Sequence, residues 1–375
     1  MAQGENMRIT SVTVYTYTVL YNGGTYSMSG GRTSQGQRSL VLRIRTNTGI
    51  EGWAENAPLG SDYLPSFYAG ELAALEELCP QILGLDPREP GAISAKLDKA
   101  MMSGTAAKSI IDIACWDVLG KAVGLPTHVL LGGRLTDQPA AFAVIGFGEI
   151  AAQVEKAKTE YEKGTIFMQL KVGDDPLVDA RRVKAIREAV PESVAMFADA
   201  NASWNLAQAL TFARALGQDI TIPLEQPCRS IADCAQVGRL TGLPIILDEC
   251  IFTMADLMAA HAAGIAGVNI KLSRVGGLTK ARMLRDAAVA LDMQVNVDDT
   301  WGCALTTGQN LQLAASTRSD RLGAVDCFAE WTNPLIAEVP RVQANGRLSP
   351  TSLPGNGSGA INVEVLGEPL LHFTE

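Results

Sequence analysis

Histidine is scarce in this chain, whose 375 residues include only His128, His261 and His372. His128 falls in a linker, His261 in the middle of an expected helix and His372 in the tail, so none is expected at the end of a strand. Metal-dependent hydrolases usually bind their ions through several histidines. That class is therefore disfavoured, and any catalytic base must come from another residue type.

Cysteine pairs with the CxxC spacing are absent, although the chain contains 7 cysteines. Neither a zinc knuckle nor a disulfide framework is indicated, and reduced thiols in the cytoplasm are the expected state. No run approaches the roughly 18 apolar residues of a membrane helix. Residues 1–10 show no charged segment followed by an apolar one, so we expect no membrane span or anchor.

Positive charge is also limited, because the formal net charge is −9 at pH 7 and no Lys/Arg-rich run occurs. Nucleic-acid binding is disfavoured, since contacts to phosphates need concentrated positive charge. Aromatic residues make up only 6%, whereas hydrophobic residues make up 47%, and the chain has 36 Gly and 17 Pro. This composition is typical of a folded α/β enzyme with many small-residue turns.

Residues 1–135 are expected to form an α+β domain. Alternating apolar and polar residues predict antiparallel strands within residues 9–54. Helical periodicity follows at 69–83, 91–102 and 105–122. Residues 21–33 contain four glycines, too many for a packed strand, so we expect a mobile loop there and a candidate lid.

Residues 136–335 show a different pattern, in which short apolar runs alternate with amphipathic helices. This alternation predicts parallel βα units. Eight barrel strands are expected, near 141–146, 166–171, 195–199, 221–225, 244–248, 267–271, 293–297 and 323–328. Residues 336–375 are too short for another unit and are expected to return to the N-terminal domain.

Three carboxylates end successive apolar runs. Asp199, Glu225 and Asp248 are separated by 26 and 23 residues, the repeat distance of a βα unit, so they should meet at the mouth of the barrel. Such a group needs a hard cation to relieve its repulsion, and an all-oxygen ligand set suits Mg²⁺. The alternative, that each acid caps the following helix, is common for one residue but improbable for all three.

Two lysines end strands on either side of these acids. Lys171 precedes Asp199, and Lys271 follows Asp248 by 23 residues. A lysine acts as a general base only if its pKa falls from roughly 10.4 towards 7, which burial and a divalent cation both promote. The arrangement indicates proton abstraction, whereas a single strand-end lysine is more often an ion-pair partner.

These motifs form a recognisable set: Lys171, Asp199-Ala-Asn201, Glu225-Gln-Pro227, Asp248-Glu249 and Lys271-Leu-Ser-Arg-Val-Gly-Gly277, preceded by Ala107-Lys-Ser-Ile-Ile-Asp-Ile-Ala-Cys-Trp-Asp117. Over nearly the whole chain the set resembles the muconate lactonizing enzyme subgroup of the enolase superfamily, in the mandelate racemase/muconate lactonizing enzyme family. The resemblance implies a modified TIM barrel, (β/α)7β, under an N-terminal α+β capping domain with substrate-specificity loops near 21–33 and 53–67. It also implies a homo-oligomer.

The resemblance assigns roles to individual residues. Asp199, Glu225 and Asp248 would bind Mg²⁺, while Lys171 or Lys271 removes the proton α to a substrate carboxylate to give an enediolate. Asn201 and Glu249 would support the ligands. The subgroup usually has Lys-x-Lys where this chain has Gln169-Leu-Lys171, so a cation that would lower the pKa of Lys171 is missing.

A narrower resemblance concerns substrate. The Gln-x-Lys form, residues 28–33 and residues 297–302 are similar to the hydroxyproline-acting branch, which includes cis-3-hydroxy-L-proline dehydratases and hydroxyproline betaine epimerases. Asp298, Asp299 and Trp301 would place negative charge and an aromatic face near a cationic nitrogen, although Asp299 as a helix cap and Trp301 as core are equally good interpretations. Weaker candidates for substrate contact are Trp331, Tyr26, Arg32 and Tyr63.

Three functions follow as hypotheses. The first is an Mg²⁺-dependent carbon–oxygen lyase that dehydrates cis-3-hydroxy-L-proline to Δ1-pyrroline-2-carboxylate. The second is a racemase or 2-epimerase of a proline derivative, a proline betaine or an N-acylated amino acid, in which the opposite lysine returns the proton. The third is a non-catalytic barrel that binds a carboxylate ligand.

Overall fold

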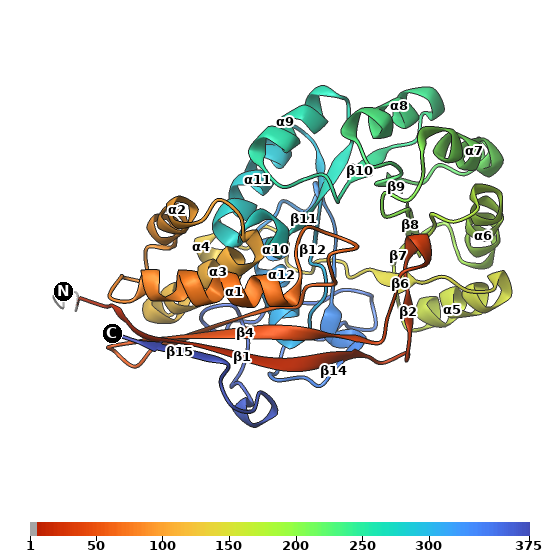
Figure 1. Cartoon of the computed structure of the whole chain (residues 1–375). Coiled ribbons are helices and arrows are strands. Elements are labelled where there is room, and N and C mark those ends of the chain that lie inside the picture. Colours follow the sequence, from red (N-terminus) through yellow and green to blue (C-terminus); the bar gives the residue numbers. More distant parts are fainter. Residues whose placement is uncertain (1–5) are drawn as a thin grey trace.

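The computed structural model describes residues 6–375 and contains a parallel barrel beside an antiparallel sheet (Figure 1). The barrel strands are hydrogen-bonded in the order β13-β12-β11-β10-β9-β8-β7-β6. Their bounds are β6 Ala143–Ile145, β7 Phe167–Lys171, β8 Ala195–Asp199, β9 Leu224–Glu225, β10 Ile245–Leu247, β11 Gly267–Lys271, β12 Gln294–Asp298 and β13 Leu322–Val325. A parallel bridge between Ala141 and Val325 brings the two ends of the sheet together.

Helices follow the first seven strands and cover the outside of the barrel. They are α5 Ile150–Glu162, α6 Pro176–Ala189, α7 Leu206–Leu216, α8 Ile231–Thr241, α9 Met254–Ala262, α10 Leu272–Val275 with α11 Leu278–Ala290, and α12 Ala304–Ala315. Among the described residues no α-helix follows β13, only the short 3₁₀ helices Phe328–Glu330 and Val363–Val365, so the predicted (β/α)7β class is confirmed. The predicted strands and observed strands agree to within a few residues.

Polar caps define where several of these helices begin. Asp175 accepts hydrogen bonds from backbone N–H groups of α6, and Ser230 does the same for α8. Asn205 and Thr253 form capping boxes at α7 and α9. These side chains satisfy backbone donors that have no partner inside the helix.

The N-terminal sheet is antiparallel, with the order β14-β1-β4-β5 and with β15 also on β1. Its strands are β1 Ile9–Tyr21, β4 Gly36–Thr46, β5 Glu51–Asn56, β14 Thr332–Asn333 and β15 Leu371–Thr374. Helices α1 Tyr68–Leu78, α2 Pro90–Ala100 and α3 Thr105–Val123 accompany it, and the short α4 Thr127–Leu130 leads to the barrel. The last strand therefore pairs with the first, and β15 lies beside β1 in Figure 1.

The glycine-rich segment is more ordered than the sequence predicts. It contains a small hairpin of β2 Tyr26–Ser27 and β3 Thr33–Ser34 around a 3₁₀ turn at Ser29–Gly31. Tyr26, Met28 and Ser29 are buried. In Figure 1 the hairpin extends from the antiparallel sheet to strands β7 and β8 of the barrel. The few large side chains of this segment hold it in place, although its glycine content alone predicted a mobile loop.

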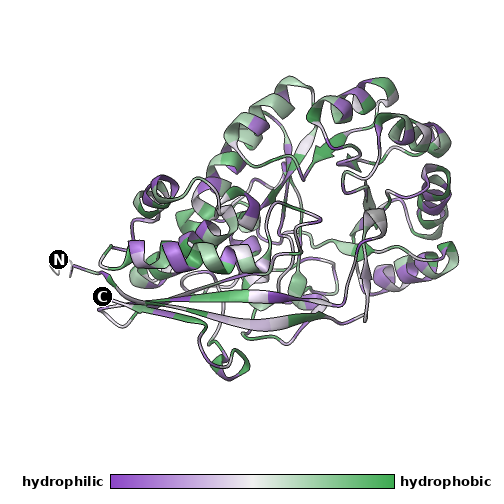
Figure 2. Ribbon diagram, in the orientation of Figure 1, coloured by the Kyte–Doolittle hydropathy of each residue, from purple (hydrophilic) through white to green (hydrophobic). Residues whose placement is uncertain are grey.

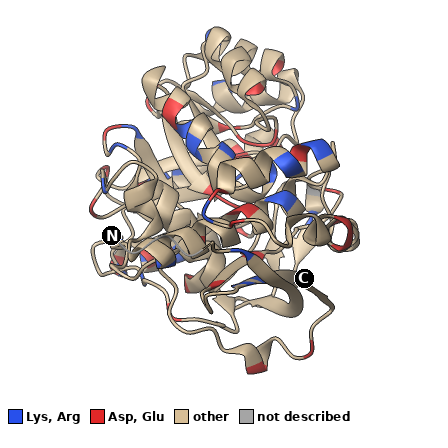
Figure 3. Cartoon of the chain, turned by 90° about the vertical axis from the view of Figure 1, so that its left-hand side faces the viewer, with Lys and Arg blue, Asp and Glu red and all other residues tan. Residues whose placement is uncertain are grey.

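Apolar residues fill the space between strands and helices. Hydrophobic colour in Figure 2 follows β10, whereas α5 and α6 carry hydrophilic colour along their length. Lys/Arg and Asp/Glu are interspersed on the side seen in Figure 3. Seven free cysteines are present among the described residues, and none of the described helices is both long and apolar enough to cross a membrane.

Candidate active site

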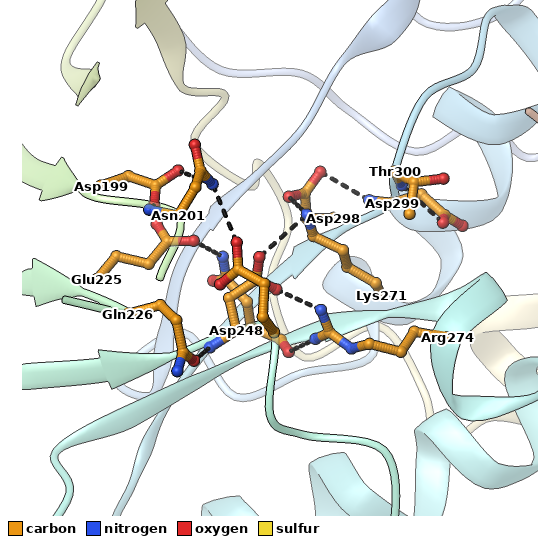
Figure 4. Close-up of polar contacts among 12 residues, drawn as sticks. Asp199, Asn201, Glu225, Gln226, Asp248, Lys271, Arg274, Asp298, Asp299 and Thr300 are labelled. Atoms are coloured by element: carbon orange, nitrogen blue, oxygen red, sulfur yellow. Dashed lines mark hydrogen bonds and ion pairs between the residues drawn. The ribbon is translucent and has the colours of Figure 1, made fainter. Parts of the chain in front are cut away.

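Strand register brings the predicted site residues together at one end of the barrel. Lys171 on β7 pairs with Asp199 on β8, and Asp199 pairs with Glu225 on β9. Asp248 follows β10, and Lys271 on β11 pairs with Asp298 on β12. Figure 4 shows several of these side chains directed towards one another from neighbouring strands. All of them are buried.

The three acids are not helix caps. The helices that follow their strands are capped by Asn205, Ser230 and Thr253 instead. Asp199, Glu225 and Asp248 therefore remain directed into the barrel mouth. This excludes the structural alternative that the sequence left open for them.

Asp248 is held by two cations. Arg274 Nη1 lies 2.6 Å from Asp248 Oδ1, and Lys271 Nζ lies 3.1 Å from Oδ2. The Tyr63 hydroxyl is also 3.1 Å from Oδ2. Burial by itself raises the pKa of Asp248, but Arg274 and Lys271 outweigh it and lower the pKa to about 2. This carboxylate is ionised throughout the physiological range.

Asp199 is bonded to a lysine and to an amide. Lys171 Nζ lies 2.5 Å from Asp199 Oδ2, and Asn201 Nδ2 donates to the same oxygen at 2.9 Å. Asn201 also donates to Glu249 Oε1 at 3.1 Å. Its backbone has a positive φ of 44°, a conformation that asparagine tolerates better than most residues. The turn after β8 thus directs Asn201 back towards the acids.

Glu225 has no cation bonded to it. Asn269 Nδ2 donates to its Oε1 at 2.6 Å, and Gln169 Nε2 donates to Oε2 at 3.2 Å. Burial, followed by the charges of Asp199 and Asp248, raises its pKa well above the usual range. Gln169, which replaces the usual lysine, therefore supplies a neutral donor where a cation would have offset this charge.

Glycine is required where the barrel meets the N-terminal hairpin. Gly173 has φ 123°, and a Cβ atom there would lie 2.7 Å from Ala200 O and 2.8 Å from Ser29 Cβ. Ser29 Oγ donates to Val172 O at 2.5 Å and lies 3.1 Å from Asn201 Oδ1. This close approach fixes the hairpin against the ends of β7 and β8.

The carboxylate oxygens of Asp199, Glu225 and Asp248 are suitable ligands for a divalent cation. These residues are buried carboxylates from three adjacent strands, Glu225 is hydrogen-bonded by the amides of Asn269 and Gln169 rather than by a cation, and Glu249 Oε2 is buried without a hydrogen-bond partner. In the arrangement described for residues 6–375, no three His, Cys, Asp or Glu side chains form a ready ligand set, because Asp199 and Asp248 turn to lysine and arginine. The ligand roles remain a prediction, and the donor types fit Mg²⁺.

The two lysines do not have the lowered pKa that the sequence analysis required. Burial lowers the pKa of Lys171, but Asp199, Tyr26 and Glu225 together outweigh it, so the pKa is raised. Lys271 is raised in the same way by Asp248, Asp298 and Tyr63. A cation on the acids would withdraw these carboxylates from the lysines and reverse the balance.

The seventh strand end is more constrained than predicted. Asp298 Oδ2 lies 3.3 Å from Lys271 Nζ. Asp299 accepts from the backbone N–H of Ser273 at 3.2 Å and of Thr300 at 2.8 Å, and it does not cap α12. Trp301 is only 1% exposed and packs against Tyr26. These residues line the same small cavity as both lysines.

Tyr63 and Arg32 connect the capping loops with the barrel. The Tyr63 hydroxyl accepts from Lys271 Nζ at 2.8 Å. Arg32 lies 5.4 Å from the centre of the Tyr63 ring and donates to Asn201 O at 3.3 Å. Tyr26 and Trp331 stack with ring centroids 5.9 Å apart. All four predicted loop and aromatic residues therefore lie at the site.

The space inside the mouth is small. The cavity lined by Lys171, Lys271 and Tyr63 measures about 30 Å³, roughly the share of one water molecule in the liquid. A wider recess of about 470 Å³ lies beside it and shares Tyr63 and Asn201 as walls. Tyr63, which accepts a hydrogen bond from Lys271, thus borders both the recess and the cavity that contains the lysines.

Several residues at this site were not predicted from the sequence. Arg274 binds Asp248, Asn269 binds Glu225, and Asp326 lies at the cavity wall directly after β13. The rule that selected the other acids, a polar residue at the end of a barrel strand, would have selected Asp326 as well. Arg274 was part of the quoted motif, but nothing in its spacing indicated a partner.

Family models match both parts of the chain. Residues 12–132 match the mandelate racemase / muconate lactonizing enzyme N-terminal domain, and residues 149–360 match the enolase C-terminal domain-like family. Among curated proteins, the chain is 36% identical to a cis-3-hydroxy-L-proline dehydratase of Roseibium aggregatum, over 98% of this chain and 100% of that protein. It is 28% identical to an N-succinyl-L-Arg/Lys racemase of Bacillus cereus, over 82% and 85% of the two chains.

A solved structure gives the same result for the fold. A mandelate racemase/muconate lactonizing enzyme from Roseovarius nubinhibens, complexed with magnesium, has a TM-score of 0.93 and 33% identity, covering 98% of this chain and 100% of its own. The matched regions include every strand end described above. The chain is thus an enzyme of the mandelate racemase/muconate lactonizing enzyme family, within the enolase superfamily.

Proposed function

We propose that this enzyme dehydrates cis-3-hydroxy-L-proline to Δ1-pyrroline-2-carboxylate and water, in a reaction that requires Mg²⁺. The observation that carries the proposal is the pair of buried lysines, Lys171 and Lys271, placed on β7 and β11 with three carboxylates on the strands between them. The full-length similarity to a cis-3-hydroxy-L-proline dehydratase supports the choice of substrate.

The metal would be held by Asp199, Glu225 and Asp248, and when bound it would stabilise the charge that develops on the substrate carboxylate. A magnesium complex of a related structure supports this choice of ion. The Gln169 and Asn269 amides would orient Glu225, and Arg274 would orient Asp248. These contacts hold the acids in place before any ligand arrives.

Lysine on one face of the substrate would remove the C2 proton, which yields an enediolate of the substrate. The C3–O bond then breaks as the C2=C3 double bond forms, and the hydroxyl leaves as water after it takes a proton. The resulting enamine gains a proton at C3 and loses one from nitrogen to give the pyrroline. Asp298, which lines the cavity, would attract the ring ammonium group.

Proton NMR in D₂O with Mg²⁺ tests the proposal. The enzyme is offered cis-3-hydroxy-L-proline, with L-proline, hydroxyproline betaine and N-succinyl amino acids as comparisons. Conversion of the first compound to pyrroline carboxylate is the expected result. Absence of any product from it, together with turnover of another compound, would contradict the substrate assignment.

A 2-epimerase is the second candidate, because lysines on two strands can remove and return a proton on opposite faces. The racemase relative supports this reaction class. Deuterium at C2 with inversion and without loss of the hydroxyl would favour it. A non-catalytic barrel that binds carboxylates predicts no deuterium exchange with any compound.

A further inference from the structure

A carboxyl group outside the predicted set completes the wall of the cavity. Asp326 follows β13 directly, and its backbone N–H donates to Val297 O of β12 at 3.0 Å. The side chain is buried and faces the same cavity as Lys171 and Lys271. Trp331 Nε1 donates to its Oδ1 at 3.2 Å. Neither the sequence motifs nor the ligand set gives this residue a role.

Asp326 is paired with a second carboxyl group. Its side chain is hydrogen-bonded to that of Asp298, the neighbouring strand end. Asp298 lies 3.3 Å from Lys271 Nζ, while the same lysine is shared with Asp248 at 3.1 Å. Asp298 and Asp326 therefore have Lys271 as their nearby cation, and Asp248 shares it. Two adjacent carboxyl groups in this situation cannot both be ionised without a large cost in free energy.

The proton of this pair belongs on Asp326. Burial first, and then the charge and hydrogen bond of Asp298, raise the pKa of Asp326 well above the usual range. Asp298, by contrast, forms an ion pair with Lys271 at 3.3 Å. Asp326 is therefore a buried carboxylic acid that can donate a hydrogen bond or a proton at neutral pH.

Resting on the proposed dehydration, we infer that Asp326 is the general acid that protonates the departing 3-hydroxyl, with Asp298 linking it to Lys271. In cis-3-hydroxy-L-proline the hydroxyl lies on the carboxylate face of the ring, and the C2 hydrogen lies on the opposite face. The acid and the base must therefore approach from opposite sides. Because Lys271 is linked to Asp326 through Asp298, we assign the base on the other side of the ring to Lys171 on β7.

Ring connectivity agrees with this assignment. The ring nitrogen and C3 are both bonded to C2, so a charged Asp298 and a neutral Asp326 on neighbouring strands would face the ammonium group and the hydroxyl, respectively. Lys171 takes the C2 proton, Asp326 gives its proton to the hydroxyl, and water leaves. Lys271 then returns a proton to Asp326 through Asp298, and solvent restores both lysines.

The test separates loss of the C2 proton from loss of the hydroxyl. With cis-3-hydroxy-L-proline in D₂O, Asp326→Asn should slow elimination by about 10²- to 10⁴-fold, while exchange at C2 stays within about threefold of the wild-type rate. With cis-3-fluoro-L-proline, whose leaving group departs as an anion, the same variant should release fluoride at nearly the wild-type rate.

Two further variants serve as controls. Asp112→Asn makes the same change at a buried acid on α3 that bonds to Thr279, away from the cavity, and should leave elimination unchanged. Asp326→Glu keeps the acid but displaces it. It should retain C2 exchange and fluoride release and eliminate water more slowly than wild type but faster than Asp326→Asn.

Several outcomes would overturn the inference. The acid role of Asp326 would be contradicted if Asp326→Asn eliminated water as fast as wild type. It would also be contradicted if the variant lost the elimination of water and the elimination of fluoride to the same extent. If Asp326→Asn does not fold, Asp326→Glu takes its place in the test. An unchanged ratio of the rates of water and fluoride elimination in that variant would contradict the acid role. Wild-type enzyme that exchanges C2 hydrogen but never eliminates would overturn the proposed function itself, and this role with it.

Discussion

Two groups of acids share the barrel mouth but differ in their partners. We call the predicted metal ligands Asp199, Glu225 and Asp248, at the ends of β8 to β10, the metal-side acids, and we call Asp298 and Asp326, at the ends of β12 and β13, the far-side acids. Cations or amide donors contact each metal-side acid, whereas the far-side acids share one lysine and one another. Carboxyl groups at strand ends of one barrel therefore have different surroundings.

This difference shows that position on the barrel does not determine the chemistry of an acid. Asp248 lies between Arg274 and Lys271, and its pKa is about 2. Asp326 has a carboxyl and an indole as neighbours, and its pKa is raised well above the usual range. The neighbouring residues decide whether a strand-end carboxyl holds a cation or carries a proton.

Removal of metal should have the largest effect, because it acts on the metal-side acids alone. Treatment with EDTA is expected to abolish turnover of cis-3-hydroxy-L-proline, and added Mg²⁺ should restore it. The far-side acids contain only two carboxyls and should not retain the ion. Turnover that persists after stringent chelation would break the distinction between the two groups.

Truncation of the lysines should have the next largest effect. Lys171→Ala and Lys271→Ala are each expected to lose about 10²- to 10⁴-fold in rate, the usual range for a general acid or base. Because they lie on different strands, Lys171→Ala should mainly block C2 exchange of the L-isomer and Lys271→Ala that of the D-isomer. NMR in D₂O with both isomers of proline measures this, and equal losses would contradict the facial assignment.

The affinity for Mg²⁺ should separate the groups directly. Asp199→Asn is expected to weaken binding by at least about 100-fold, since loss of even an outer partner costs 10- to 100-fold. Asp298→Asn, the matched change on the far side, should stay within about threefold. Isothermal titration calorimetry of both variants measures the difference. Similar weakening in both would mean that the far-side acids also bind the ion.

A buried acid outside both groups gives the smallest expected effect. Burial raises the pKa of Asp112 to about 7 despite hydrogen bonds from Thr279. The folded state therefore holds a proton that the unfolded state, with a pKa of roughly 3.9, releases. Stability should fall as pH rises through this window, by about 2 kcal/mol between pH 5 and 6.5.

Urea unfolding of wild type and Asp112→Asn at these two pH values isolates that contribution. The variant should lack this component of the fall. A wild type and a variant with the same pH dependence would show that Asp112 is ionised in the folded protein. Burial would then not be enough to keep a proton on a carboxyl group of this chain.

The barrel and its acids could be predicted because their signals are local. Each strand end combines an apolar run with a polar residue, and the 23- to 26-residue spacing identifies the βα repeat. Contacts between distant segments left no such signal. The hydrogen bond from Lys271 to Tyr63 joins residues 208 apart, and Asp326 acquires its character only from Asp298 on the adjacent strand. The raised pKa of the lysines was missed for the same reason.

The hydroxyl of Tyr63, which bonds both to Lys271 and to Asp248, has a consequence for the timing of turnover. A cavity of about 30 Å³ is too small for a proline ring, so residues that line it, Tyr63 among them, must move before the substrate binds. Substrate binding should then be slower than diffusion allows. Added viscogen should therefore slow turnover only slightly, whereas Tyr63→Phe, which removes both hydrogen bonds, should speed it. A tyrosine that bonds to one of the two lysines would then also set the pace of the enzyme.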